Sequence, residues 1–262
     1  MKKIFVCLAN SKKYGGRCLA GIELTRDEQG KPHLTLDAQG KPRWIRPVAH
    51  TEHGEIPQME VKHIRLLDFV EFESAEPCPH GYQTENIFYQ GKTFDVCGNL
   101  NVKSENLDQL VENQSDIILG NREKYISASE VDALGHSIVL IKTDTSRIKL
   151  YETGAHLRMA FFWQNTAYDL PVTDMDFHLR WIDEPTILHD KPNAYLCISL
   201  AINFEGRHHK FISWPNRHET FPFVKTECFS VFISGGGHFQ TFPAAFFSQC
   251  FGCVEQDFPH AF

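Results

Sequence analysis

The sequence lacks any hydrophobic run long enough to cross a membrane. No segment of its 262 residues approaches the roughly 20 consecutive apolar residues that a transmembrane helix needs. The apolar stretch at residues 4–9 is too short for the hydrophobic region of a signal peptide, and the polar residue Asn10 follows it directly. We therefore expect a soluble protein of the cytoplasm.

The sequence also lacks the short motifs of the common enzyme classes. It contains no Gly-x-Ser-x-Gly elbow, no His-Glu-x-x-His helix and no Gly-x-Gly-x-x-Gly dinucleotide fingerprint. Asp174 and Asp176 are spaced like metal ligands, but a turn cap at a strand end explains Asp174 better. Since neither a paired acid and base nor a nucleophile with its base can be named, we expect a non-enzymatic protein without a cofactor.

The eight cysteines do not form the pattern of a disulfide scaffold. They are spread along a chain far longer than the small secreted domains that depend on disulfides, which favours reduced, packed thiols. Cys250 and Cys253 form a lone Cys-x-x-Cys pair, with Cys228, His238 and His260 in the same region. A zinc site normally combines two such half-sites, so Cys250 and Cys253 are weak metal candidates and we expect no metal.

The net charge of −7 argues against indiscriminate adhesion to nucleic acid. The charge is unevenly distributed, because residues 1–67 hold 12 Lys and Arg against 7 Asp and Glu, a balance of +5. Residues 68–135 hold 4 against 13, a balance of −9. An anionic ligand should therefore favour the first segment, while the acidic segment 68–135 is a candidate surface for a protein partner.

Short stretches with β-strand patterns occur in both halves of the chain. In the first half they cover residues 3–8, 17–24, 43–48, 66–73 and 86–89. In the second half they cover residues 137–142, 146–152, 157–164, 167–173 and 195–204. Short strands with glycine and proline turns favour a mostly β protein made of barrels or sandwiches. Spaced apolar residues at 99–119 predict one or two short helices between the halves.

The composition changes near residue 214. Residues 221–262 contain 11 phenylalanines and one basic residue, Lys225, and the phenylalanines follow neither a strand nor a helix period for long. This segment is either an extra packed element or a poorly ordered one.

A polar turn near the N-terminus combines hydrogen-bond donors, cations and glycines. It runs from Asn10 and Ser11 through Lys12, Lys13 and Tyr14 to two glycines and Arg17. Glycines allow backbone N–H groups to approach an anion closely. The spacing of a phosphate-binding P-loop is missing, so a solvated β-turn is an equally good interpretation.

Two further motifs carry aromatic and amide groups. An exposed Trp44 beside Arg46 would stack a base while the cation holds phosphate. From spacing alone, a Trp44 in the core with Arg46 in a salt bridge is the better interpretation. Gln83 and Asn86 follow Tyr82 on a loop, where their side chains would either read a base edge or brace another loop. Bracing is the favoured role.

Taken in order, these pieces resemble the dual OB-fold domain family, a group of uncharacterised bacterial and archaeal proteins. The resemblance covers about residues 3–212 and is carried by residues 7–22 (CLANSKKYGGRCLAGI), 44–48 (WIRPV), 66–71 (LLDFVE), 82–86 (YQTEN), 137–141 (SIVLI), 168–174 (YDLPVTD) and 197–200 (CISL). The first of these pieces is the most distinctive.

The resemblance implies two consecutive OB-like small β-barrels with short connecting helices and a C-terminal extension. The expected domains are a first barrel at 1–98, a connector at 99–135, a second barrel at 136–214 and the phenylalanine-rich tail at 215–262. Members of the family tend to end soon after the segment equivalent to 197–210, so we expect the tail to lie outside the barrel core, as an unrelated extension or an altered reading frame.

The resemblance also implies association with nucleic acid, in bacterial defence or mobile-element settings. We therefore predict a protein that binds single-stranded nucleic acid or a nucleotide through its first barrel, where basic residues and aromatics occur together. The predicted site contains Lys12, Lys13, Arg17 and Arg46 for phosphate, Trp44 or Tyr14 for stacking, and Asn10, Ser11, Gln83 and Asn86 for hydrogen bonds.

The alternative is a protein-interaction or regulatory subunit in which the polar motifs hold the two barrels together. Burial separates the two hypotheses. If Arg17, Trp44 and Gln83 are enclosed between the barrels, the structural role gains support, and if they line an open groove, the ligand role does.

Overall fold

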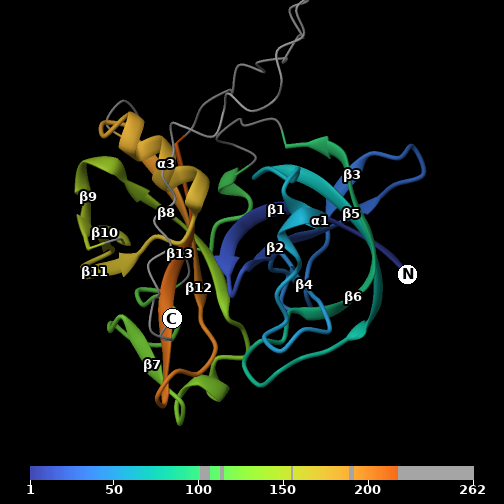
Figure 1. Ribbon diagram of the computed structural model, residues 1–262, viewed down its shortest axis with the longest axis horizontal. Helices are drawn as coiled ribbons and strands as arrows, with labels where there is room; N and C mark the ends of the chain where they lie inside the picture. The colour runs from blue at the N-terminus through green and yellow to red at the C-terminus, as the bar shows by residue number, and fades with distance from the viewer. Residues whose placement is uncertain (101–106, 113–114, 155, 189–191, 218–262) are drawn as a thin grey trace, which may run out of the picture. The chain divides into compact units, whose positions relative to one another are not determined.

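The computed structural model describes residues 1–100, 107–112, 115–154, 156–188 and 192–217 (Figure 1). In the first hundred residues, the alternating apolar patterns form six strands. These are β1 (Lys2–Lys13), β2 (Gly16–Arg26), β3 (Pro32–Leu34), β4 (Trp44–Val48), β5 (Asp68–Pro77) and β6 (Asn86–Asn99). A single helical turn, α1 (Gln58–Val61), lies between β4 and β5.

Five of these strands close into a barrel. The sheet has the order β1-β5-β6-β4-β2-β3, and β1 pairs a second time with β2, so the ring closes while β3 extends β2 outside it. Only β4 and β6 pair in parallel among the strands of this ring. This is the strand order of an OB barrel, in which β2 and β4 take the places of the second and third strands.

The barrel interior is filled by every second residue of its strands. Phe5, Leu19, Ile45 and Phe72 belong to this buried cluster. The two barrel-closing strands approach one another very closely at Gly21, where an added Cβ would lie 1.8 Å from the carbonyl oxygen of Val6.

The second half of the chain forms two sheets, whose strands occur along the chain in the OB order of the first barrel. One sheet is β11-β10-β9 and the other is β7-β13-β12-β8. Their bounds are β7 (Tyr125–Ser127), β8 (Ile138–Asp144), β9 (Ile148–Thr153), β10 (His156–Trp163), β11 (Thr166–Pro171), β12 (Asn193–Leu200) and β13 (Arg207–Arg217), with the 3-10 turns η1 (Val131–Ala133) and η2 (Thr145–Arg147) and the helix α3 (Met175–Asp183).

This half is a half-barrel in which the first OB strand is broken. Turn η2 separates β8 from β9, so β8 pairs with β12 while β9 pairs with β10. A parallel bridge between Val172 and Ile212 joins the ends of the two sheets. In this order β10 and β11 are the second and third OB strands, and α3 follows them as α1 follows β4.

A buried lysine, Lys210, joins strand β13 to the chain before β7. The Lys210 Nζ donates to the carbonyl oxygens of Ile118 and Asn121, both at 2.7 Å, and to Asn121 Oδ1 at 2.9 Å. Burial lowers the pKa of Lys210 to about 7, and the negative charge of Glu123 opposes that shift. The bonds fix the chain before β7 onto β13.

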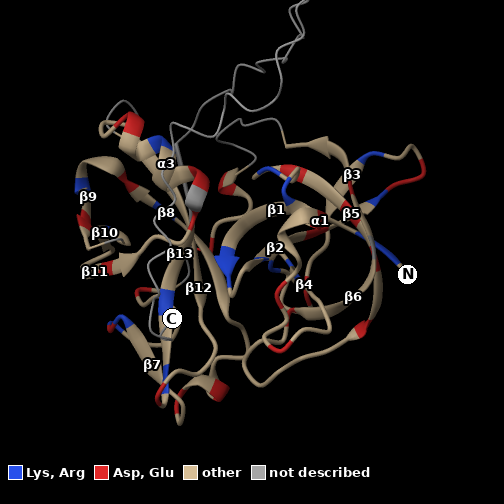
Figure 2. Cartoon of the chain, viewed as in Figure 1, with Lys and Arg blue, Asp and Glu red and all other residues tan. Residues whose placement is uncertain are grey.

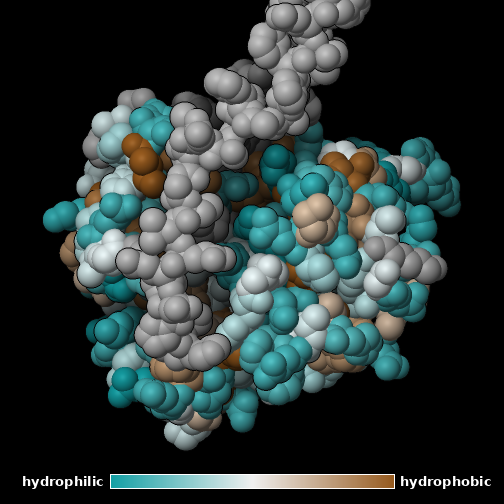
Figure 3. All heavy atoms as spheres, in the orientation of Figure 1, coloured by the Kyte–Doolittle hydropathy of each residue, from teal (hydrophilic) through white to brown (hydrophobic). Residues whose placement is uncertain are grey.

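Helix α3 begins at an aspartate cap. The Asp174 carboxylate accepts a hydrogen bond of 3.0 Å from the backbone N–H of Phe177. Asp174 therefore has the role of a cap, as the sequence analysis favoured, and not that of a metal ligand. The helix buries Phe177 and exposes Leu179 and Ile182, and Figure 3 shows a brown, hydrophobic patch over α3 on an otherwise mainly hydrophilic face.

The two barrels pack against each other through an apolar layer. Residues of β1 and β2 that point away from the first barrel's interior meet residues of β8 and β12, with two leucines of the connector between them. The layer contains Val6, Leu8, Ala20, Ile22, Ile138, Leu140, Tyr195, Cys197, Leu107 and Leu110. Both faces of β1 are thus buried, which explains why residues 4–9 form a continuous apolar run and not an alternating one.

The prediction of a mostly β chain with two OB-like barrels is confirmed. The tail from residue 218 onward, including Cys250 and Cys253, lies outside the described residues, as do parts of the predicted connecting helices (101–106 and 113–114). Of the helices within the described ranges, none combines the length and apolar character that a membrane span requires.

Candidate nucleic-acid interface

The polar turn at the N-terminus is the tip of the β1–β2 hairpin. Lys13 pairs with Gly16, and the two turn residues, Tyr14 and Gly15, both have positive φ values, 44° and 80°. A two-residue loop with this backbone is a type I′ turn, which matches the twist of a hairpin. Tyr14 is 52% exposed, and its ring lies 3.9 Å from that of His53. Tyr14 is therefore displayed on the surface, where it is free to meet a ligand.

Basic residues beside this turn are open to solvent to different degrees. Lys12 is exposed, whereas Lys13 and Arg17 are half-buried, and Figure 2 shows blue, basic positions at the end of β1. Burial lowers the pKa of Lys13. The backbone of Arg17 is fixed by two hydrogen bonds with Ile56, of 2.8 and 2.9 Å. These three cations remain available to a phosphate group.

The amide and hydroxyl groups at the start of the turn serve the fold. Asn10 donates through Nδ2 to the carbonyl oxygen of Ile64 at 3.1 Å, and Ser11 is buried. Asn10 thus links β1 to the chain at Ile64, and Ser11 is not presented to a ligand.

Arg46 lies in the interior, in contact with both barrels. Its Nη2 atom is 2.9 Å from Glu85 Oε1 and donates to Ser137 Oγ at 2.8 Å, and Ser137 in turn donates to Glu85. Only 4% of the Arg46 side chain and 3% of the Glu85 side chain are exposed. The prediction that Arg46 holds phosphate does not fit this position, because its charge is already neutralised by a buried carboxylate.

Gln83 and Asn86 are buried beside the same network. Asn86 Nδ2 donates to Gln83 Oε1 at 3.3 Å, and both residues are less than 10% exposed. The adjacent Tyr82 enters the core of the half-barrel, where its hydroxyl donates to the carbonyl oxygen of Ala201 at 2.6 Å. A ligand cannot reach Gln83 or Asn86, so their predicted contact with a base is replaced by the bracing role.

Trp44 is half-buried and tied to the connector. Its Nε1 donates to Glu112 Oε1 at 2.9 Å, and its ring packs against the apolar layer between the barrels. Trp44 and Arg46 point outward from β4, the third OB strand of the first barrel. That strand and β2 form the surface that commonly binds oligonucleotides in OB folds, and here the second barrel covers it.

The corresponding surface of the half-barrel is not covered in this way. On β10, the odd-numbered residues Leu157, Met159, Phe161 and Trp163 are buried, while the even-numbered ones are exposed or half-buried. We define the β10 face by the outward residues of β9, β10 and β11 and the adjoining turn: Arg147, Lys149, Tyr151, Arg158, Phe162 and Asp169. The sequence reasoning above does not include these residues.

Phe162 is the most exposed aromatic residue of the β10 face. Its side chain is 46% exposed, and the Arg147 guanidinium carbon lies 5.0 Å from the ring centroid. Lys149 is exposed on the neighbouring strand. An aromatic ring at the surface beside two cations is the combination that stacks a base and holds the adjoining phosphate.

A second group of side chains stiffens the same face. Arg158 Nε is 3.1 Å from Asp169 Oδ1 and 3.3 Å from the Tyr151 hydroxyl, which donates to Asp169 Oδ2 at 2.7 Å. The three residues come from three adjacent strands. Because Asp169 offsets the charge of Arg158, Arg147 and Lys149 are the cations of this face that are left for an anion.

Metal binding has no support among the described residues. Within those ranges, no group of three or more His, Cys, Asp or Glu side chains is placed to hold a metal ion. Five cysteines, at 7, 18, 78, 97 and 197, are free thiols.

Comparison with known proteins identifies a matching family. The family model described as a dual OB-containing domain matches residues 3–214. No curated protein matches the sequence. Among solved structures, the tetrameric p202 HIN2 is 7% identical, covering 82% of this chain and 90% of that chain with a TM-score of 0.29. A structure described as the molecular basis for abrogation of activation of pro-inflammatory cytokines is 8% identical, covering 83% and 93% with a TM-score of 0.30.

Proposed function

The chain belongs to the family of dual OB-containing domains, and from this premise we propose that it binds single-stranded nucleic acid through the β10 face. OB barrels commonly bind oligonucleotides on their second and third strands and the adjoining loops. In the first barrel this surface is occupied by the second barrel. The equivalent strands of the half-barrel present Phe162, Arg147 and Lys149 to solvent, so the half-barrel takes the role that we assigned to the first barrel from sequence.

The exposed ring of Phe162 beneath Arg147 is the observation that carries this proposal. A base stacked on an aromatic side chain contributes about 1–3 kcal/mol, largely independent of sequence. The chain as a whole carries a charge of −7, so binding depends on local cations, and its affinity must fall with salt. A single strand fits this face better than a duplex, because the bases of a duplex are already stacked on each other.

The test is fluorescence anisotropy with labelled single-stranded DNA, single-stranded RNA and duplex DNA at roughly 50 and 200 mM salt. Phe162→Ala should weaken single-strand binding by about tenfold or more, since it removes one stacking contact. Arg147→Gln should weaken binding and reduce the slope of log affinity against log salt by about 1. Leu179→Ala is the matched control, because Leu179 is also an exposed apolar residue, on α3.

An undiminished affinity in both Phe162→Ala and Arg147→Gln would sink the assignment to the β10 face. An Arg17→Ala variant tests the hairpin turn of the first barrel in the same assay, and a loss confined to that variant would move the site there. If no nucleic acid binds at either salt concentration, the alternative of a protein-interaction subunit, with segment 68–135 facing the partner, takes its place.

We further propose a non-enzymatic role in the cytoplasm, within bacterial defence or mobile-element systems. This setting follows from the family resemblance of the sequence. The non-enzymatic role is tested by assaying the purified protein for nuclease activity with and without divalent cations. Cleavage of any nucleic acid would contradict a pure binding role.

A further inference from the structure

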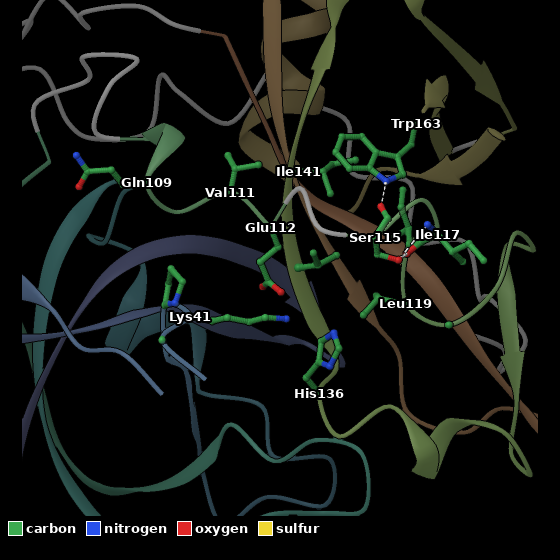
Figure 4. A pocket seen from close by; sticks show the side chains of 15 residues that line it. Lys41, Gln109, Val111, Glu112, Ser115, Ile117, Leu119, His136, Ile141 and Trp163 are labelled. Atoms are coloured by element: carbon green, nitrogen blue, oxygen red, sulfur yellow. Dashed lines mark hydrogen bonds between the residues drawn. The ribbon is translucent and has the colours of Figure 1, made fainter. Parts of the chain in front are cut away.

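A cavity of about 320 Å³ lies at the open side of the half-barrel (Figure 4). Its walls come from the turn before β4, the connector, the start of β8 and the end of β10. The volume is at the lower end of the range for small-molecule sites, roughly 300–1,000 Å³. It has room for one ring system with one substituent and is too small for a polymer.

One end of the cavity is polar. Lys41, Glu112 and His136 line it, and Figure 4 shows their side chains directed into the same space. The Glu112 carboxylate accepts from Trp44 through Oε1, and His136 Nδ1 lies 2.9 Å from the carbonyl oxygen of Leu134. Because Nδ1 donates to that carbonyl oxygen, Nε2 of His136 is left for a ligand as an acceptor in the neutral ring and as a donor in the protonated ring. The Lys41 ammonium is left as a donor, which favours an anionic group.

Lys41 is presented by a rigid turn. The Asp37 carboxylate accepts from the backbone N–H groups of Gln39 and Lys41 at 2.8 and 2.9 Å, and Gly40 has φ 76°. The same construction occurs in the preceding turn, where Asp27 accepts from the N–H groups of Gln29 and Lys31. The second turn places its lysine at the cavity, whereas Lys31 does not line it.

The other end of the cavity is apolar and firmly supported. Val139, Ile141 and Trp163 form part of this wall and are buried in the core of the half-barrel. Trp163 is held by a hydrogen bond of 3.1 Å from Nε1 to the carbonyl oxygen of Ser115, which Figure 4 shows as a dashed line. A ring would rest against these side chains without ordering them, so little conformational entropy would be lost on binding.

We propose that this cavity binds a small ligand that has a flat aromatic ring and one anionic group, the chemistry found in a nucleoside monophosphate. The ring packs against Val139, Ile141 and Trp163, and the anion accepts a hydrogen bond from Lys41. Nε2 of His136 accepts from a hydroxyl of the ligand or, in the protonated ring, donates to the anion. Glu112 Oε2 accepts from a hydroxyl or amine of the ligand. The proposal is independent of nucleic-acid binding, because the residues of the cavity are distinct from those of the β10 face.

The test is a titration of the full-length protein with the four common nucleoside monophosphates, the matching nucleosides and inorganic phosphate. Calorimetry and tryptophan fluorescence are the readouts, since Trp163 lines the cavity. At least one monophosphate should bind, its nucleoside should bind at least tenfold more weakly, and phosphate alone should not bind detectably. Binding by no monophosphate, or equal binding by phosphate alone, would overturn the proposal.

Two variants locate the ligand. Lys41→Gln should weaken monophosphate binding by about tenfold or more, because it removes a charge-assisted hydrogen bond. Lys31→Gln makes the same change in the equivalent turn away from the cavity and should bind as the parent does. Ile117→Trp should block the cavity by bulk. Equal losses of monophosphate affinity in Lys41→Gln and Lys31→Gln would place the ligand elsewhere. Phe162→Ala should leave monophosphate binding unchanged even if nucleic-acid binding is lost.

Discussion

Replacing Arg46 with methionine separates a structural role of the motif at residues 44–48 from a role in ligand binding. The substitution keeps an unbranched apolar stem but removes the guanidinium group and its charge. In the structure, Arg46 bonds to Glu85 and Ser137, which lie 39 and 91 residues further along the chain. If these bonds hold the barrels together, the variant should lose stability while its folded fraction still binds nucleic acid.

The expected loss follows from burial. With Arg46 gone, the Glu85 carboxylate is left almost fully enclosed without its counter-charge, and breaking a buried ion pair in this way typically costs about 3–5 kcal/mol. Domains of this kind are stable by only about 5–15 kcal/mol, so the loss is a large fraction of the total. The Nε atom of Arg46 and Oε2 of Glu85 have no protein partner among the described residues, so the pair is imperfectly satisfied and the lower part of this range is the better expectation.

Urea denaturation followed by tryptophan fluorescence measures this change. With a slope of about 1–3 kcal/mol per molar urea, the midpoint should fall by about 1–3 M. Adding Glu85→Gln to Arg46→Met should restore part of the loss, because the uncompensated carboxylate disappears. Lys2→Met is the control, since Lys2 also pairs with a glutamate, Glu71, but is 68% exposed and its loss should leave the midpoint almost unchanged. An Arg46→Met variant with an unchanged midpoint but a weakened, less salt-dependent affinity for nucleic acid would refute the structural reasoning.

Two further substitutions follow from single residues. Burial raises the pKa of Asp174 from 3.8 to about 6, so the folded state disfavours the ionised form, and the stability of the protein should fall as pH rises from about 4 to 6. Asp174→Asn keeps the helix cap without the charge. Urea unfolding should show the variant to be more stable than the parent at pH 8, by at most about 3 kcal/mol, and equally stable at pH 4. A variant that is less stable than the parent at pH 8 would contradict this. Tyr14→Asn should stabilise the hairpin by about 1 kcal/mol, because asparagine tolerates a positive φ better, and its nucleic-acid affinity in the anisotropy assay should match the parent's unless the hairpin turn is the binding surface.

Local pattern accounts for the strands but not for their environment. The runs at 3–8 and 157–164 were recognisable as strands because apolar residues and turn signals are local features. Whether the outward side of β2 and β4 meets solvent or a second barrel depends on Ile138 and Tyr195, which lie 90 or more residues further along the chain. The partners of Arg46 were hidden for the same reason, since no local signal connects it with Glu85 and Ser137.

Phe162 was missed because three aromatic residues follow one another at 161–163 and hide the alternation. The signal lies further back in the strand, where His156 and Arg158 are even-numbered and polar. A period of two carried forward from these residues places Phe162 on the outer face and Phe161 and Trp163 in the core, as the structure has them. The turn at Gln164, which has φ 50° and pairs Trp163 with Thr166, fixes that register.

The placement of the two barrels gives the polar motifs and the β10 face different roles. An OB surface that binds a strand must leave its aromatic and basic side chains free to exchange water for a ligand. In the first barrel, Trp44 and Arg46 already bind Glu112 and Glu85 in place of water. Releasing these two side chains for a ligand would separate the barrels. In the half-barrel, Phe162 lies beside Arg147, which donates to the carbonyl oxygen of Gln164 at the strand end, and 46% of Phe162 is exposed, so a ligand displaces mainly water. Because separating the barrels would cost free energy, we expect a nucleic acid to bind the β10 face, although the first barrel has the more basic sequence.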